Sequence, residues 1–332
     1  MSVIPASIGS SISSFLDAAG KFFSSLAAIL WGALLLALLF FGASLSVRSR
    51  AAFNVLRAAF PGERILWRRI WGAYMAAFGT NAVIPARTGD VVRLFLVRTS
   101  VPNSSYPAIA SSFLVENIFD TAIGILVLIF AFTQGVFPKP PDFSKIPAFD
   151  LQFFAAHLRF TLFLITLLGI LALVAFAVLS ARVRAFWAHV SQGVTILRDR
   201  PRYLRQVFAL QLAGWLLRFT AFYFMLDAFN IGGSVRNVLL VFGVNAVAAF
   251  VPFTPGGAGV QQALLVKVFV GTADAATVAA YSVGQQVAIA AFTFAVGFTA
   301  LVTIFRFRSI KEVIGRGRAE QAAEAAAARG AV

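Results

Sequence analysis

Long, nearly uncharged runs of apolar residues dominate the chain and set the number of predicted membrane crossings. The first run, Leu26 to Val47, has 22 residues. At about 1.5 Å of rise per residue, a helix of that length covers the roughly 30 Å hydrocarbon core of a bilayer. Similar runs occupy 106–134, 158–181, 203–228 and 276–305. The pattern therefore predicts five membrane-spanning helices.

Two further apolar stretches, 65–99 and 235–270, begin like spans but are interrupted near their middle. The first break runs from Pro85 to Asp90, and the second from Pro252 to Gly259. Proline lacks a backbone donor and glycine weakens a helix, so a continuous helix is disfavoured at both places. Each stretch is predicted to form two short helices joined by a tip.

Basic residues gather in three stretches, 48–69, 182–205 and the tail after 305, whereas the loop 135–157 is balanced in charge. An excess of arginine and lysine marks cytoplasmic segments, so the three basic stretches are predicted inside and the loop outside. Successive basic stretches must then be separated by an even number of crossings. Both broken segments must therefore return to the side they enter from. The alternative, a mere kink in a full span, would place an arginine cluster outside.

A similar five-residue sequence, here called the echo, precedes the break in each of the two segments. Residues 79–83 read GTNAV before the first break, and residues 243–247 read GVNAV before the second. A chance echo among so many alanines and valines is the alternative. Inverted repeats with broken helices are a frequent transporter architecture. The predicted fold is all-α: a polytopic helical membrane protein with two re-entrant, Pro/Gly-broken helical hairpins in an inverted repeat. It comprises an N-terminal interfacial segment (1–25), a transmembrane domain (26–305) and a basic cytoplasmic tail (306–332), with the N-terminus outside.

Composition supports a membrane location and excludes several other classes. The 332 residues are 60% hydrophobic and only 12% charged, which excludes a cytosolic enzyme and a nucleic-acid-binding domain. The net charge of +15 is then the positive-inside signal. There is no cysteine and there are only two histidines, so we expect no metal, no cofactor and no catalytic activity.

Three ionisable residues fall inside predicted spans, where charge is costly and each one is a functional hypothesis. Glu116 and Asp120 lie four residues apart, on one helix face. They relay protons, bind a cation, or form a structural salt bridge with Arg87 or Arg93. Arg218 lies roughly 20 Å into its span. It either pairs with a carboxylate or faces a water-filled cavity and meets an anion, and guanidinium matches phosphate well.

Polar residues also surround both breaks. Arg87, Asp90 and Arg93 recur every third residue after the first tip, where free backbone N–H groups can bind an anion. Snorkelling to the headgroups is the alternative for Arg93. At the second tip, glycines allow close backbone approach to a ligand. The remaining candidate contacts are Asn81, Asn245, Gly256, Gly257, Gly259, Gln262 and Gln285. Gln285 serves equally well as a polar contact between helices.

Three motifs resemble those of a known family. Residues 81–93 (NAVIPARTGDVVR), 116–120 (ENIFD) and 255–263 (PGGAGVQQA) resemble hallmarks of the lysylphosphatidylglycerol synthase transmembrane family, the flippase-like membrane proteins. The family commonly has Arg-Glu where this chain has Gln261 and Gln262, so a charge-based mechanism at the second tip is not expected.

The resemblance implies that the protein translocates a phospholipid or lipid-linked molecule between leaflets, or assists that translocation. Membrane lipids are the expected partners, with a lipid-modifying or glycosyl-transferring enzyme as a further possible one, in a bacterial cytoplasmic membrane. Arg87, Arg93 and Arg218 would meet the phosphate, and Glu116 and Asp120 would balance them. The alternatives are a small-solute or ion transporter and a non-transporting partner of an envelope enzyme.

Overall fold

Every regular element that the structure describes is a helix. A computed structural model describes residue 24, residues 27–83, 88–134, 191–248 and 260–307, and residue 315. In these ranges four helices are long and apolar enough to cross a membrane. The predicted span 158–181, the loop 135–157 and most of both terminal segments lie outside the described residues.

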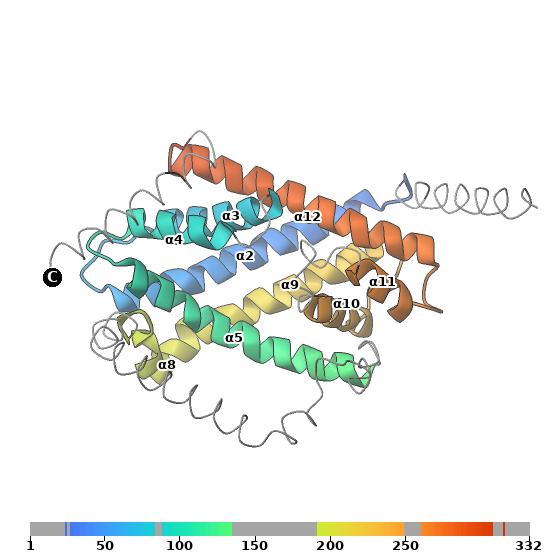
Figure 1. Cartoon of the computed structure of the whole chain (residues 1–332), viewed down its shortest axis with the longest axis horizontal. Helices are drawn as coiled ribbons and strands as arrows, with labels where there is room; N and C mark the ends of the chain where they lie inside the picture. The colour runs from blue at the N-terminus through green and yellow to red at the C-terminus, as the bar shows by residue number, and fades with distance from the viewer. Residues whose placement is uncertain are drawn as a thin grey trace, which may run out of the picture.

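The four long helices run along the long axis of the molecule, two inclined one way and two the other (Figure 1). They are α2 (Trp31–Ala59), α5 (Tyr106–Thr133), α9 (Ala209–Ala228) and α12 (Ala275–Ile304). A 3₁₀ turn (Thr195–Arg198), the short α8 (Arg200–Tyr203) and a π-helical turn (Leu204–Phe208) lead into α9. Helix α2 continues well past Val47, because its second half keeps an apolar face that packs on α9.

Two pairs of short helices correspond to the broken segments. Helices α3 (Trp67–Val83) and α4 (Thr88–Ser100) form the first pair, and α10 (Val235–Ala248) and α11 (Val260–Val268) form the second. The pairs lie towards opposite ends of the long helices (Figure 1). The Asn103 side chain donates to Glu63 Oε1 at 3.1 Å, which joins the loop after α4 to the loop before α3. The first pair thus starts and finishes at the same end. Its re-entry into a membrane stays a prediction.

Each short pair packs on the long helix that follows the other pair. Helix α3 packs on α12, the long helix that follows the second pair, and α10 packs on α5, the long helix that follows the first. Helices α2 and α9, which precede the two pairs, pack extensively on each other. This is the set of contacts that a pseudo-twofold axis between two repeats would produce, although the inverted repeat itself stays a prediction.

The two asparagines of the echo make corresponding contacts. Asn81 Oδ1, on α3, accepts a hydrogen bond at 2.7 Å from the backbone N–H of Gly89, the second residue of α4. Asn245 Oδ1, on α10, accepts one at 2.7 Å from the side chain of Gln261, the second residue of α11. Each asparagine thus links the first helix of its pair to the first turn of the second helix.

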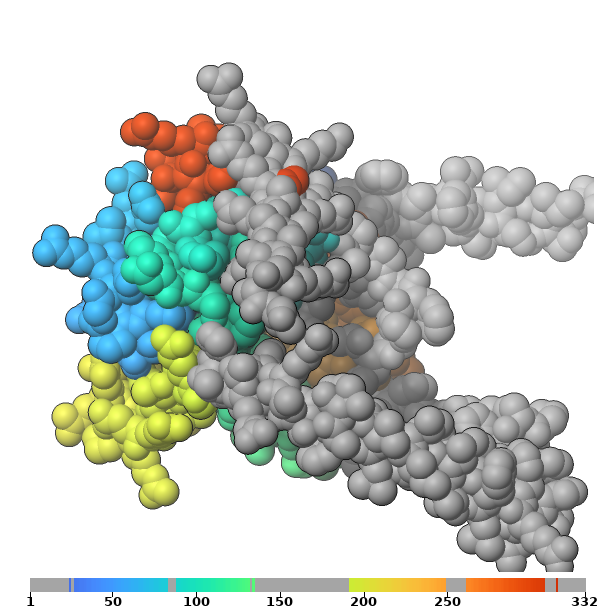
Figure 2. All heavy atoms as spheres, turned by 60° about the vertical axis from the view of Figure 1, so that its left-hand side comes forward, coloured from blue at the N-terminus to red at the C-terminus, as the bar shows by residue number. Residues whose placement is uncertain are grey.

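Exposed arginines gather at the end of the molecule where α2 and α12 finish. Figure 2 turns this end forward, with side chains from the segment before α3 and from α8 projecting outward. The exposed arginines of this end are Arg50, Arg57, Arg64, Arg68, Arg69, Arg198, Arg200, Arg205 and Arg306. Arg48, the first basic residue of the stretch 48–69, differs from these exposed arginines. It is only 4% exposed, because its helix face points into the bundle.

Helices α3 and α12 approach closely through glycine. A Cβ atom on Gly297 would lie 2.5 Å from the carbonyl oxygen of Met75, and one on Gly79 would lie 2.7 Å from that of Thr293. Small residues at such crossings let helix backbones meet where lipid competes with side-chain contacts. The α3–α12 pairing therefore depends on both glycines.

We expect Gly297→Leu to destabilise the protein by about 1–3 kcal/mol, since the added side chain must push two backbones apart. Thermal unfolding in detergent measures the loss. Gly124→Leu is the matched control, because a Cβ at Gly124 meets nothing within 4 Å. Equal melting temperatures for the two variants would contradict this account of the helix crossing.

Single cysteines test the sidedness of the two helix pairs, since the chain has no thiol of its own. Thr99, in the last turn of α4, and Thr272, just after α11, are both exposed. We expect a membrane-impermeant reagent to label Thr99→Cys from the same side as Arg57→Cys, and Thr272→Cys from the opposite side. Labelling of Thr99→Cys from the side opposite Arg57→Cys would make the first pair a full crossing.

Candidate functional site

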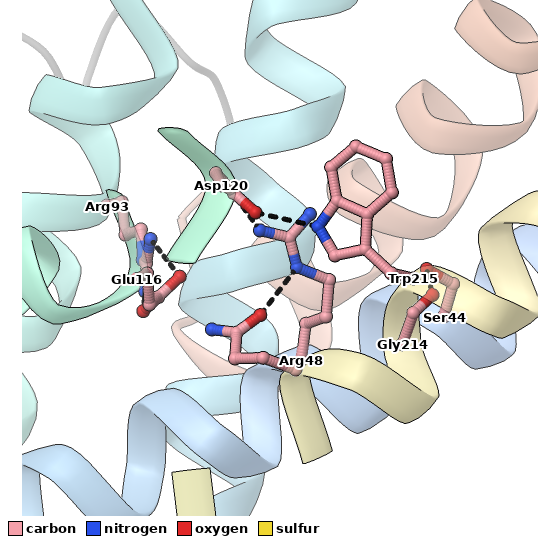
Figure 3. A network of polar contacts seen from close by, with 8 residues as sticks. Ser44, Arg48, Arg93, Glu116, Asp120, Gly214 and Trp215 are labelled. Atoms are coloured by element: carbon pink, nitrogen blue, oxygen red, sulfur yellow. Dashed lines mark hydrogen bonds and ion pairs between the residues drawn. The ribbon is translucent and has the colours of Figure 1, made fainter. Parts of the chain in front are cut away.

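An ion pair joins α2 to α5, with its arginine buried and its carboxylate partly exposed (Figure 3). Arg48 Nη2 contacts Asp120 Oδ2 at 2.5 Å, and Arg48 Nε donates to Gln211 Oε1, on α9, at 3.0 Å. Asp120 also accepts a hydrogen bond at 2.9 Å from the indole N–H of Trp215, on α9. Three long helices are thus tied together through one guanidinium and one carboxylate.

Local packing holds the Arg48 side chain in place. Gly214 presents a bare backbone to it, and a Cβ there would lie 2.4 Å from Arg48 Cγ. One turn before Arg48, the Ser44 hydroxyl donates to the Gly214 carbonyl at 2.8 Å (Figure 3). The α2–α9 crossing therefore leaves a slot for the arginine stem and directs its charged end towards Asp120.

A second ion pair joins the first short pair to α5. Arg93, on α4, contacts both carboxylate oxygens of Glu116 (Figure 3). The two side chains are 12% and 5% exposed. The guanidinium also lies over the rings of Tyr74 and Phe113, at 4.5 and 4.1 Å from their centroids. Such two-point, charge-assisted contacts fix orientation as well as charge.

Arg218 has aromatic neighbours and no carboxylate partner among the residues described. Its guanidinium carbon lies 5.5 Å from the Trp215 ring centroid, 6.0 Å from that of Phe222 and 5.9 Å from that of Phe242. Its Nε atom is buried without a hydrogen-bond acceptor. Since Trp215 also binds Asp120, Arg218 lies next to the first ion pair without joining it.

The net charge of this cluster follows from its members. Arg48, Arg93 and Arg218 carry three positive charges, and Glu116 and Asp120 carry two negative ones, so one positive charge is left without a described counter-ion. Asp120 is the more accessible carboxylate, with a side chain that is 35% exposed. An uncompensated charge inside a membrane bundle is costly unless water or an anion reaches it.

The second half of the molecule carries a neutral polar network. The Gln286 amide donates to Gln261 Oε1 at 2.5 Å, and Gln261 in turn donates to Asn245. Gln285 is 2% exposed, and its side-chain oxygen is buried without a donor. Gln262 is half-buried. Neutral glutamine amides thus make the polar contacts beside the second tip, where the sequence predicts no charge-based mechanism.

The structure brings together four of the predicted residues and separates others. Arg93, Glu116, Asp120 and Arg218 converge on α4, α5 and α9. Asn81 and Asp90 are exposed, at the end of α3 and the start of α4. The predicted residues outside the described part of the chain are Arg87, Gly256, Gly257 and Gly259.

Sequence reasoning missed three members of the cluster: Arg48, Gln211 and Trp215. Arg48 was grouped with the cytoplasmic arginines because it directly follows the first apolar run. A signal was present, since Ser44, Arg48 and Ala52 recur every four residues along a stripe that the structure buries. Gln211 and Trp215 carry no charge, so a search for ionisable residues in the spans did not find them.

The long apolar helices and the buried charge cluster define a polytopic helical integral membrane protein. The chain matches the family described as the lysylphosphatidylglycerol synthase TM region over residues 4–297, and it belongs to that family. The match confirms the resemblance found in the motifs and extends it into the N-terminal segment. Comparisons with curated proteins and with solved structures give no significant match.

A double-mutant cycle tests the Arg93–Glu116 pair. We expect Arg93→Met or Glu116→Leu alone to cost about 3–5 kcal/mol of stability, because each leaves an unpaired buried charge. The double variant should lose much less than the sum of the two. Unfolding in detergent micelles measures all three.

The surface contact between Glu63 and Asn103 supplies the control for that cycle. Glu63→Gln should change stability by less than about 0.5 kcal/mol. Additive losses for Arg93→Met and Glu116→Leu would show that the two side chains do not depend on each other.

Proposed function

We propose that the protein moves a phosphate-bearing lipid between the two leaflets, or assists that movement, with Arg218 as the contact for the headgroup phosphate. Family membership supports a membrane protein of lipid metabolism or transport. Translocation, the lipid headgroup and a non-enzymatic mechanism are the steps that the proposal adds.

One observation carries the proposal: Arg218 is the cluster's guanidinium without a carboxylate in the described part of the chain. Three aromatic rings hold it from the side. Those rings stabilise the cation but do not accept a hydrogen bond from its buried Nε. A phosphate oxygen would satisfy this donor and offset the extra positive charge.

The two ion pairs limit the positive charge that an incoming headgroup meets. Arg48 and Arg93 are already matched by Asp120 and Glu116, so an incoming anion meets one free positive charge rather than three. Trp215 contacts both Asp120 and Arg218. A headgroup bound at Arg218 would therefore lie next to the network of polar contacts that joins α2, α5 and α9. Binding there is coupled to the relative positions of those helices, which is what an alternating-access step requires.

We expect Arg218→Ala to abolish lipid translocation while the protein stays folded, since the substitution removes the phosphate contact and relieves an unpaired charge. Arg218→Lys should retain part of the activity, because it keeps a charge but loses the planar fork. The measurement is the transfer of fluorescent phospholipids between leaflets of reconstituted liposomes, with thermal unfolding recorded for each variant.

Arg205→Ala is the matched control, because Arg205 is exposed in the π-helical turn that precedes α9 in the same span. It should translocate lipid like the wild type. Full activity of Arg218→Ala would refute the phosphate role. Recovery of activity in Arg218→Ala/Asp120→Asn would show instead that Arg218 serves as a structural counter-charge.

A further inference from the structure

A groove runs along the outside of the molecule between α3 and α12. The part farther from the basic end, here called the upper part, has a volume of about 400 Å³. It is lined mainly by apolar side chains, among them Trp71, Val296 and Ala300. The lower part is about 550 Å³ and reaches the basic end, next to Arg69 and Arg306. The two parts share Arg68, Thr303 and Ile304, so they lie next to each other on the surface.

The two parts of the groove differ in chemistry. The lower part holds Arg68, Arg69 and Arg306 together with the hydroxyl of Thr99, and no described residue lining either part is acidic. In the upper part, the polar edge of Trp71 is directed inward, where its N–H donates to Ser46 Oγ at 3.0 Å. The indole therefore offers an apolar surface to the groove. An apolar groove that ends in several cations matches an acyl chain joined to an anionic headgroup.

The position directly after the end of α12 carries an arginine although its backbone conformation suits glycine. Arg306 has a φ of +59°, in the left-handed region that glycine adopts most easily. It follows Phe305, the last residue of the helix turn, where many helices place glycine. A positively charged side chain occupies this position at the mouth of the groove even though glycine would fit the backbone better.

We propose that this groove, here called the α3–α12 groove, binds one anionic phospholipid from the leaflet at the basic end, with its phosphate at Arg68, Arg69 and Arg306. The site shares no residue with the Arg218 cluster, so it is a second lipid site that does not depend on translocation. The bound lipid contacts residues of both α3 and α12 and so holds the two helices together.

Thermal unfolding with added lipid tests the site. In a neutral detergent, phosphatidylglycerol should raise the melting temperature of the wild type, whereas phosphatidylcholine or inorganic phosphate at the same concentration should not. The variant Arg68→Gln/Arg306→Gly should lose more than half of that shift. It should melt normally without lipid, because glycine suits the backbone at 306. Native mass spectrometry should show that it retains one phosphatidylglycerol fewer.

Two controls decide the interpretation. Arg200→Gln/Arg205→Gln removes the same charge from exposed positions at the same end, outside the groove, and should keep the full shift. Arg306→Lys should also keep it. If both double variants lose the lipid-induced rise in melting temperature equally, general surface charge causes the rise and the proposed site is wrong. An unchanged rise in Arg68→Gln/Arg306→Gly would also overturn the site. Neither result bears on Arg218, whose test is translocation.

Discussion

The pairing of Arg48 with Asp120 is the interaction on which the arrangement of the long helices depends. It draws a guanidinium from α2 and a carboxylate from α5 into contact, and Gln211 and Trp215 add α9 to the same network. Charges in a low-dielectric interior stay only where partners and hydrogen bonds compensate them. The network therefore fixes the angular position of each helix about its own axis, which apolar contacts with similar side chains and lipid tails specify poorly.

The same constraint explains why the uncompensated charge stands out. Arg93, on the first short pair, forms an ion pair with Glu116, whereas the described contacts of the Arg218 guanidinium are with aromatic rings. In the corresponding place of the second half, Asn245 and Gln261 of the second pair and Gln286 of α12 carry hydrogen bonds without charge. The two halves therefore share the asparagine contacts between their paired helices but differ in charge. Among the described residues, the carboxylates of the cluster lie in the first half, and the unpaired arginine lies on α9.

Much of the fold could be predicted from the sequence, because apolar run length and the prolines and glycines between runs report helix ends directly. The first broken segment forms two helices, of which α3 ends at Val83 and α4 begins at Thr88, within the predicted break. The carboxylates Glu116 and Asp120 were recognised by their cost in a span. Arg93 was one of two arginines that the sequence offered as a partner, whereas Arg48 was not considered, since the choice of partner depends on which helices touch. That information lies in glycine contacts such as Gly214 against Arg48, which no local pattern reveals.

The central claim is that Arg218 meets a lipid phosphate rather than a protein carboxylate. The most direct test is an electron cryo-microscopy map of the protein in nanodiscs that contain anionic phospholipid. The account predicts headgroup density within about 4 Å of the Arg218 guanidinium, the reach of an ion pair, and no such density in Arg218→Ala. An aspartate or glutamate side chain of the protein against Arg218 would contradict it.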